Sequence, residues 1–121
     1  MNSLLRRPRR SHLLAAFWLT AIAVGVLALI PATFPMLSTG WDKANHALAF
    51  AVLGLLGCAC WPHAAARVLI ALAAYGGAIE IAQTFTETRM GEWTDWFADI
   101  AGFCIALAVR WRYAMHAELL P

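Results

Sequence analysis

The chain has 121 residues, of which 62% are hydrophobic and 13% are charged, and its formal net charge is +2. A soluble domain is about 45–50% apolar and about 25% charged, so this composition excludes an ordinary water-soluble domain. It also excludes a disordered chain, which requires low hydrophobicity. The length allows a single domain, residues 1–121, with room for about four membrane-spanning helices of ~20 residues each.

Four apolar stretches of membrane-spanning length predict an all-α integral membrane four-helix bundle. In chain order they cover residues 12–30, 44–61, 67–85 and 94–111. None has the alternating pattern of a membrane-spanning strand. The basic segment RRPRR before the first stretch is also typical of a signal peptide. The apolar run after it is too long for one and lacks a cleavage site, so we interpret it as an uncleaved span.

The basic residues lie mostly on one side of the predicted spans. Seven of the nine belong to this side: Arg6, Arg7, Arg9, Arg10, Arg67, Arg110 and Arg112. The positive-inside rule makes it the cytoplasmic side, so both termini are expected in the cytoplasm. Seven basic residues and one acid give this side +6, whereas two basic residues and six acids give the outer side −4.

The outer ends of the spans carry a concentration of polar and ionisable residues. Spacings of three and four residues place the members of each group on one helical face. The predicted binding residues are Asp42, Lys43, His46, Glu80, Gln83, Arg89, Asp95 and Asp99. Glu87 and Glu92, in the loop after the third span, are expected to be solvated.

Glu80 and Asp99 fall inside the predicted spans, where a lipid-facing charge would cost at least about 2–3 kcal/mol. They should therefore face the bundle and find partners there, for which we expect Lys43 or Arg89. For Asp95, the expected partner is His46.

Purely structural roles are the alternative. Asp42 and Asp95 stand at helix starts, where acidic side chains cap the helix and interact favourably with its dipole. Glu80, Gln83 and Asp99 lie too far inside the spans to be caps. They can instead form an interhelical network that only holds the bundle together.

The order of these residues resembles the VanZ-like family of small bacterial integral membrane proteins. The similarity covers about residues 42–102 and consists of Asp42-Lys43-x-x-His46, Glu80-x-x-Gln83, Arg89 and Asp95-x-x-x-Asp99-x-x-Gly102. Two positions differ from the family pattern: Ala47, where an aromatic is expected, and Asp99, where Asn is frequent. The resemblance implies a multi-pass VanZ-like domain in the bacterial cytoplasmic (inner) membrane. It also implies a link to resistance against the glycopeptide antibiotic teicoplanin, but no particular reaction.

Three functions are compatible with these residues. The first is recognition, in an extracytoplasmic polar pocket, of an envelope component such as a lipid-linked cell-wall precursor. Arg89 and Lys43 would hold its phosphate or carboxylate. The expected partners are membrane lipids and this component, with homo-oligomerisation left open and no nucleic acid.

The second function is that of a small intramembrane enzyme. Glu80, Asp99 and His46 are the candidate catalytic residues for acid–base chemistry on an envelope lipid or precursor. The third is a divalent-metal site formed by His46, Glu80, Asp95 and Asp99, whose side chains are acceptable ligands. Because Lys43 and Arg89 would repel the ion, the sequence predicts no metal and no cofactor.

Overall fold

The structure is a computed structural model that describes residues 7–31 and 42–119. Four helices follow one another: α1 (Arg10–Leu29), α2 (Asp42–Cys60), α3 (Ala65–Gln83) and α4 (Trp93–Leu119). The all-α prediction is confirmed, and α1, α2 and α3 match the predicted spans to within two residues at both ends. Arg6, which was counted for the orientation, lies outside the described residues.

The helix ends follow from local sequence. α1 stops at Leu29 because Pro31 disfavours a helical conformation at Ile30, whose ψ of 154° is extended. α4 continues to Leu119, eight residues beyond the predicted span end at 111. No proline or glycine follows Trp111 within this helix, so nothing in the local sequence stops it at the edge of the hydrocarbon layer.

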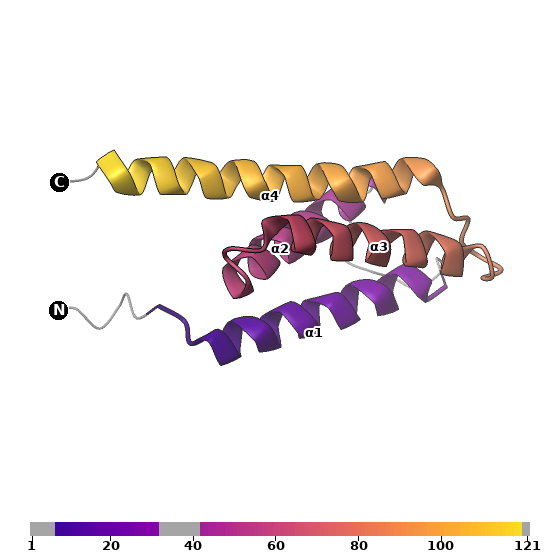
Figure 1. The fold of residues 1–121 in the computed structure, drawn as a ribbon. Helices are drawn as coiled ribbons and strands as arrows, with labels where there is room; N and C mark the ends of the chain where they lie inside the picture. Colours follow the sequence, from indigo (N-terminus) through magenta and orange to yellow (C-terminus); the bar gives the residue numbers. More distant parts are fainter. Residues whose placement is uncertain (1–6, 32–41, 120–121) are drawn as a thin grey trace.

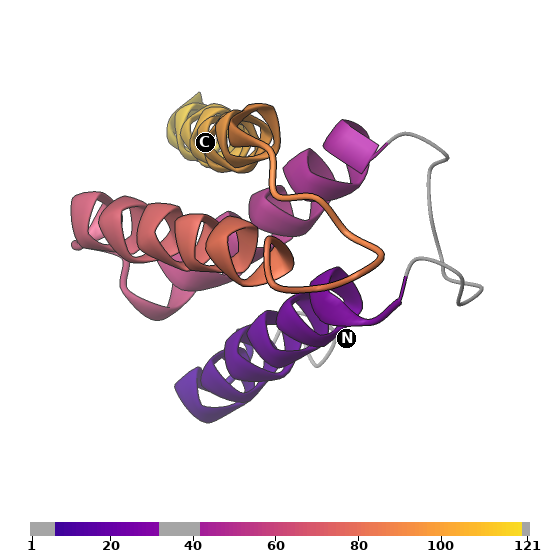
Figure 2. The ribbon, with the colours of Figure 1, turned by 90° about the vertical axis from the view of Figure 1, so that its right-hand side faces the viewer.

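The helices form a bundle in which α2 contacts all three of the others and packs most extensively against α4. Figure 1 shows that the amino end of α1 and the carboxyl end of α4 lie at the same end of the bundle. We call this the basic end. The opposite end holds the carboxyl ends of α1 and α3 and the amino ends of α2 and α4, and we call it the polar end. Figure 2 looks onto the polar end, where the segment between α3 and α4 arches across.

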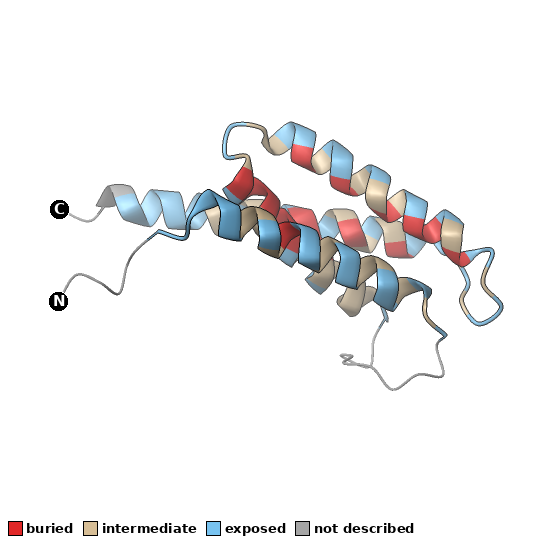
Figure 3. Cartoon of the chain, turned by 90° about the horizontal axis from the view of Figure 1, so that it is seen from below, coloured by how far each residue is buried: buried red, intermediate tan, exposed pale blue. Residues whose placement is uncertain are grey.

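Much of the apolar surface faces outward. Figure 3 shows α1 exposed along most of its length, and Phe17 is its only buried residue. Exposed large apolar side chains also lie on the other helices, including Leu48, Ile70, Ile81 and Ile105. Such a surface is unfavourable in water but is the normal surface of a protein in lipid.

Three helices, α1, α2 and α3, are long and apolar enough to cross a membrane. α4 is longer but is not among them, since it carries two acids in its first half and arginines beyond its middle. The chain therefore has the helices of a membrane protein, and the fourth span stays a prediction.

The approach of α2 to α4 depends on Gly102. A Cβ atom at this position would overlap the backbone carbonyl oxygen of Ala47. The two helices are therefore in backbone contact at this level, one turn from Asp99, and side chains that lie beside the contact are brought close together.

Candidate functional site

His46 of α2 lies at the centre of a polar cluster built from three helices. Its Nδ1 atom is 2.8 Å from Oδ1 of Asp99 on α4 and 3.9 Å from Oε1 of Glu80 on α3. Its Nε2 atom is 3.8 Å from Oδ2 of Asp95, one turn before Asp99. The fold thus brings together, around one imidazole, three carboxylates that are far from it in sequence.

Lys43 forms the outer part of this cluster, at the start of α2. Its Nζ atom is 3.2 Å from Oδ1 of the buried Asp95 and 3.3 Å from Oε2 of Glu92. The expectation that Lys43 pairs with Glu80 or Asp99 is therefore wrong, because Asp95 and Glu92 surround it instead. Glu92 is half exposed but not simply solvated, and the Lys43 ammonium lowers the pKa of the Glu92 carboxyl.

Asp42 is exposed at the beginning of α2. It still belongs to the neighbourhood of the cluster, since its carboxylate and ligating atoms of His46 and Asp95 lie within 4.8 Å of one another. Asp95 is buried and bonded to Lys43 of another helix. Its contacts therefore join α2 to α4, which a simple helix cap would not do.

Two carboxylates are buried with only half of their acceptor capacity used. Glu80 is 4% exposed, and its Oε2 accepts a hydrogen bond of 2.8 Å from the backbone N–H of Glu92. Asp99 is 1% exposed, and its Oδ1 faces His46. The other oxygens, Glu80 Oε1 and Asp99 Oδ2, have no hydrogen-bond partner within the described residues.

Gly76 of α3 makes room for the Asp99 carboxylate. A Cβ atom at this position would lie 2.5 Å from Asp99 Oδ2, whereas a Cβ atom at Gly77 would be at an ordinary 3.6 Å from Trp96. The two adjacent glycines therefore differ. Only Gly76 is needed for the carboxylate to fit between α3 and α4.

Arg89 and Gln83 turn away from the carboxylates toward α1. Gln83 Nε2 donates to the Ala28 carbonyl at 2.9 Å, and Arg89 Nε donates to the Ile30 carbonyl at 3.2 Å. The last carbonyls of a helix lack intrahelical donors, and α1 has no basic residue in its own last turn to supply them. The prediction that Arg89 neutralises Glu80 or Asp99 is therefore wrong, because these carbonyls engage its guanidinium.

Two aromatic residues also fix the helices that carry the cluster, and the sequence interpretation missed both. Trp96 Nε1 donates to the Ala73 carbonyl at 2.8 Å and joins α4 to α3. The Tyr75 hydroxyl donates to the Ala21 carbonyl and joins α3 to α1. An aromatic residue with a polar group inside a predicted span was the available signal, because such a group needs a partner when buried.

The contacts separate the structural interpretation from the functional one. The bonds His46–Asp99 and Lys43–Asp95 join α2 to α4, as an interhelical network requires. Within the described residues, Glu80 Oε1 and Asp99 Oδ2 accept no hydrogen bond, and a buried acceptor without a hydrogen bond destabilises a fold. The cluster therefore has acceptor capacity beyond what holds the bundle together. Its excess of carboxylates favours a cation or hydrogen-bond donors.

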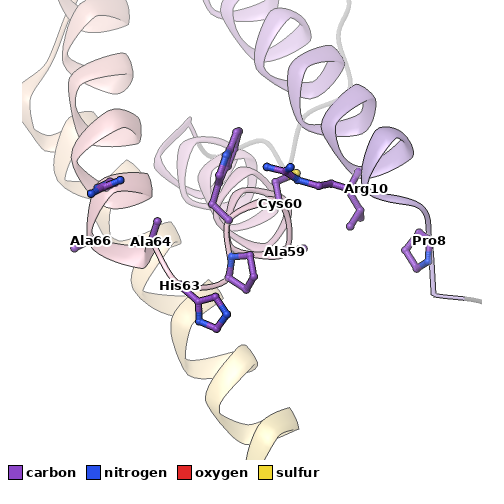
Figure 4. A pocket seen from close by; sticks show the side chains of 11 residues that line it. Pro8, Arg10, Ala59, Cys60, His63, Ala64 and Ala66 are labelled. Carbon is purple, nitrogen blue, oxygen red and sulfur yellow. The ribbon is translucent and has the colours of Figure 1, made fainter.

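A cavity of about 700 Å³ lies at the basic end, and Figure 4 shows the side chains that line it. Arg10, Cys60, His63 and Arg67 contribute to its lining. The polar cluster is closely packed by comparison, because Glu80, Asp95 and Asp99 are all buried. Six of the eight residues predicted for a polar pocket thus lie together in a compact cluster, and Glu92, which was not predicted, joins Asp42 and Lys43 at its exposed rim.

These features define a helical membrane protein with a buried polar cluster at one end of its bundle. Residues 10–113 match the protein family described as VanZ/LLP1, which covers most of the chain, so the chain belongs to the VanZ/LLP1 family. The resemblance noted from the order of the polar residues is thereby confirmed. No match was found among curated proteins or among solved structures.

Proposed function

We propose that this VanZ-like membrane protein recognises a cell-envelope component, such as a lipid-linked cell-wall precursor, at its polar end. One observation carries the proposal: Glu80 and Asp99 each keep a buried carboxylate oxygen to which no described residue donates a hydrogen bond. Such oxygens accept hydrogen bonds from amines or sugar hydroxyls, both of which are common in cell-wall precursors. Binding would satisfy acceptors that the fold leaves open.

The exposed rim supplies the second element of recognition. Lys43 is more than one-third exposed and can exchange its bond to Glu92 for a phosphate or a carboxylate of the ligand. Arg89, bonded to the carbonyls of α1, is not part of this surface in the proposal. Lipids surround the exposed apolar helices and are the second class of partner.

We also propose that the polar end faces the outside of the bacterial cytoplasmic membrane and that both termini are cytoplasmic. The excess of arginines at the basic end supports this orientation. A green fluorescent protein fused to the carboxyl terminus should fluoresce, and alkaline phosphatase fused there should be inactive. The opposite pair of results would overturn the orientation.

Binding is tested with the purified chain in lipid nanodiscs and a labelled lipid-linked disaccharide-peptide precursor. A polyprenyl phosphate without sugar and peptide serves as the control ligand. We expect Glu80→Gln and Asp99→Asn to weaken precursor binding by about tenfold or more, since each removes a charged acceptor. Glu87→Gln, in the loop, should leave it unchanged. Equal binding by all four proteins, or none by the wild type, contradicts the proposal.

A link to teicoplanin is part of the proposal and is tested in cells. Expression of the wild-type chain should raise the teicoplanin concentration needed to stop growth, and Glu80→Ala and Asp99→Ala should abolish this increase. Membrane levels of each variant must be matched by immunoblot. If both variants are present and protect as well as the wild type, the polar cluster is not the site of action.

A second candidate function, an intramembrane enzyme, is favoured by the 2.8 Å contact between His46 and Asp99. A carboxylate bonded to an imidazole is a common arrangement for moving a proton, and the nearby Glu80 offers a second acid. The attacking group would be water or a substrate hydroxyl. Release of product from the labelled precursor by the wild type, but not by Glu80→Gln, would distinguish this function from binding alone.

A further inference from the structure

Three ligand-type atoms converge in the buried part of the polar cluster. One ligand atom from each of three side chains lies within 4.8 Å of the other two: a ring nitrogen of His46 and a carboxylate oxygen each of Glu80 and Asp99. We propose that these three side chains bind a divalent transition-metal ion of the Zn²⁺ type. This goes beyond recognition of an envelope component, because it assigns an inorganic ion to the centre of the cluster.

The separations of the atoms suit such an ion. Two ligands at about 2.1 Å from a tetrahedral Zn²⁺ lie about 3.4 Å apart. His46 Nδ1 is 2.8 Å from Asp99 Oδ1 and 3.9 Å from Glu80 Oε1, so the required separation falls between the two observed values. Movements of about half an ångström, within the range of side-chain torsions, bring both pairs to that separation.

The free oxygens are the second, independent indication of a ligand. Glu80 and Asp99 are both more than nine-tenths buried, and Glu80 Oε1 and Asp99 Oδ2 have no partner in the described part of the chain. A cation bound to Glu80 Oε1 and Asp99 Oδ1, the two oxygens paired with His46 Nδ1, would satisfy the free oxygen of Glu80 and offset the repulsion between the two carboxylates.

The groups around these ligands have the arrangement of a second coordination shell. A metal-bound histidine usually offers its other ring nitrogen to a carboxylate. Here Asp95 Oδ2 lies 3.8 Å from His46 Nε2, and Lys43 holds the same carboxylate from the other side. The backbone N–H of Glu92 fixes the second oxygen of Glu80. Each proposed ligand except Asp99 thus has a polar group that orients it, and Gly76 leaves space for Asp99.

The sequence raised the objection that Lys43 and Arg89 would repel a metal ion, and the fold largely answers it by pairing both side chains elsewhere. Arg89 donates to the carbonyls of Leu27, in the last turn of α1, and of Ile30, directly after the helix. Lys43 is paired with two acids, Asp95 and Glu92. These carboxylates offset its positive charge and so reduce its repulsion of the proposed ion. Among the described residues, no unpaired cation then lies beside the three carboxylates and the imidazole.

The donor set defines the class of ion. One imidazole and two carboxylates favour Zn²⁺, Mn²⁺ or Fe²⁺ over the softer ions that thiolates select. Three protein ligands also leave at least one coordination position open, as in catalytic rather than structural zinc sites. An oxygen of an envelope ligand can take that position, but binding of the ion does not depend on such a ligand.

The test uses the full chain in nanodiscs, stripped with a chelator, dialysed against Zn²⁺ alone and analysed by mass spectrometry for metal. We expect one Zn²⁺ per wild-type chain. Asp95→Asn should weaken binding about 10–100-fold as an outer-shell change, and Glu80→Gln or Asp99→Asn should weaken it more. Glu87→Gln and His63→Gln are the matched controls and should bind as the wild type does.

Two results would overturn the proposal. One is a wild-type chain that retains no stoichiometric Zn²⁺ after this dialysis. The other is binding that survives Glu80→Gln but is lost in Asp42→Asn, which would move the ion to the outer group of Asp42, His46 and Asp95. Circular dichroism identifies variants that fail to fold, and Co²⁺ absorption of the wild type reports the coordination without any substitution. Precursor is absent from this experiment, so failure of the metal site and failure of the proposed function are seen separately.

Discussion

The two ends of the bundle treat their charges in opposite ways. At the basic end, Arg10, His63 and Arg67 border an open cavity, where water or lipid headgroups can surround each charge. At the polar end, Asp95 and Asp99 are buried against His46 and Lys43 of another helix. The charges at the basic end contribute to stability independently of one another, whereas each charge at the polar end depends on its buried partner.

The difference is a matter of dielectric environment. An exposed charge loses little when a neighbour is removed, because water screens it. A buried charge whose partner is removed keeps its desolvation penalty without compensation. We therefore expect single substitutions to affect stability far more at the polar end than at the basic end.

The largest effect is expected for His46→Ala, because it leaves the buried Asp99 carboxylate without its 2.8 Å partner. Loss of one member of a buried pair lowers the free energy of unfolding by about 3–5 kcal/mol. Denaturant titration of the chelator-treated chain in micelles, followed by circular dichroism, measures the change. His63→Ala, at the basic end, is the control and should change it by less than about 0.5 kcal/mol. Equal losses of unfolding free energy for the two histidines would show that the two ends respond alike.

The adjacent glycines give the next effect. Gly76→Ala places a methyl group 2.5 Å from the Asp99 carboxylate and should destabilise the fold by about 1–3 kcal/mol through overpacking. Gly77→Ala meets its nearest neighbour at 3.6 Å and should be neutral or slightly stabilising, since alanine favours a helix. The same denaturant titration compares them. A neutral Gly76→Ala would show that Asp99 is not held in the observed position.

A smaller effect is expected from the rim of the polar end, through pH. Lys43 lowers the pKa of Glu92 in the folded chain, so ionised Glu92 adds stability above its unfolded pKa. This stability is lost as the pH falls through the lowered folded value. The difference in unfolding free energy between wild type and Glu92→Gln should therefore shrink on acidification and stay constant near neutral pH. A difference independent of pH would show that the pair contributes nothing.

The smallest effect is expected for Arg67→Gln at the basic end. Arg67 lines the open cavity, and its replacement should change the free energy of unfolding by no more than about 0.5 kcal/mol. Denaturant titration again gives the value. A loss comparable to that of His46→Ala would mean that the cavity residues form an interdependent cluster of their own.

Much of the fold and part of the site were predictable from the sequence. The lengths of the apolar runs and the positions of Pro31 and Pro62 located α1, α2 and α3 to within two residues. Helical spacing also placed Asp95 and Asp99 on one face, and the structure brings both to His46. The end of α4 was not predictable in this way, because the thickness of a bilayer limits a span but not a helix.

The choice of partners was not predictable, and Arg89 shows why. Its charge made the carboxylates of Glu80 and Asp99 its expected partners, yet it donates to Ile30 and Leu27 of α1. Charge indicates which groups attract each other, but the packing of helices decides which come within reach. The carbonyls at the end of α1 also needed donors, and that need is invisible until the neighbouring loop is placed.

The amino-acid sequence alone shows that this chain is helical, suited to a membrane and rich in acids at one end, because composition and periodicity decide which segments favour lipid and which favour water. The packed bundle shows in addition that Lys43 pairs with Asp95, that Asp99 fits against Gly76, and that no described residue donates a hydrogen bond to Glu80 Oε1. Contacts between helices depend on their separation and rotation, and these follow from the packing of the whole bundle.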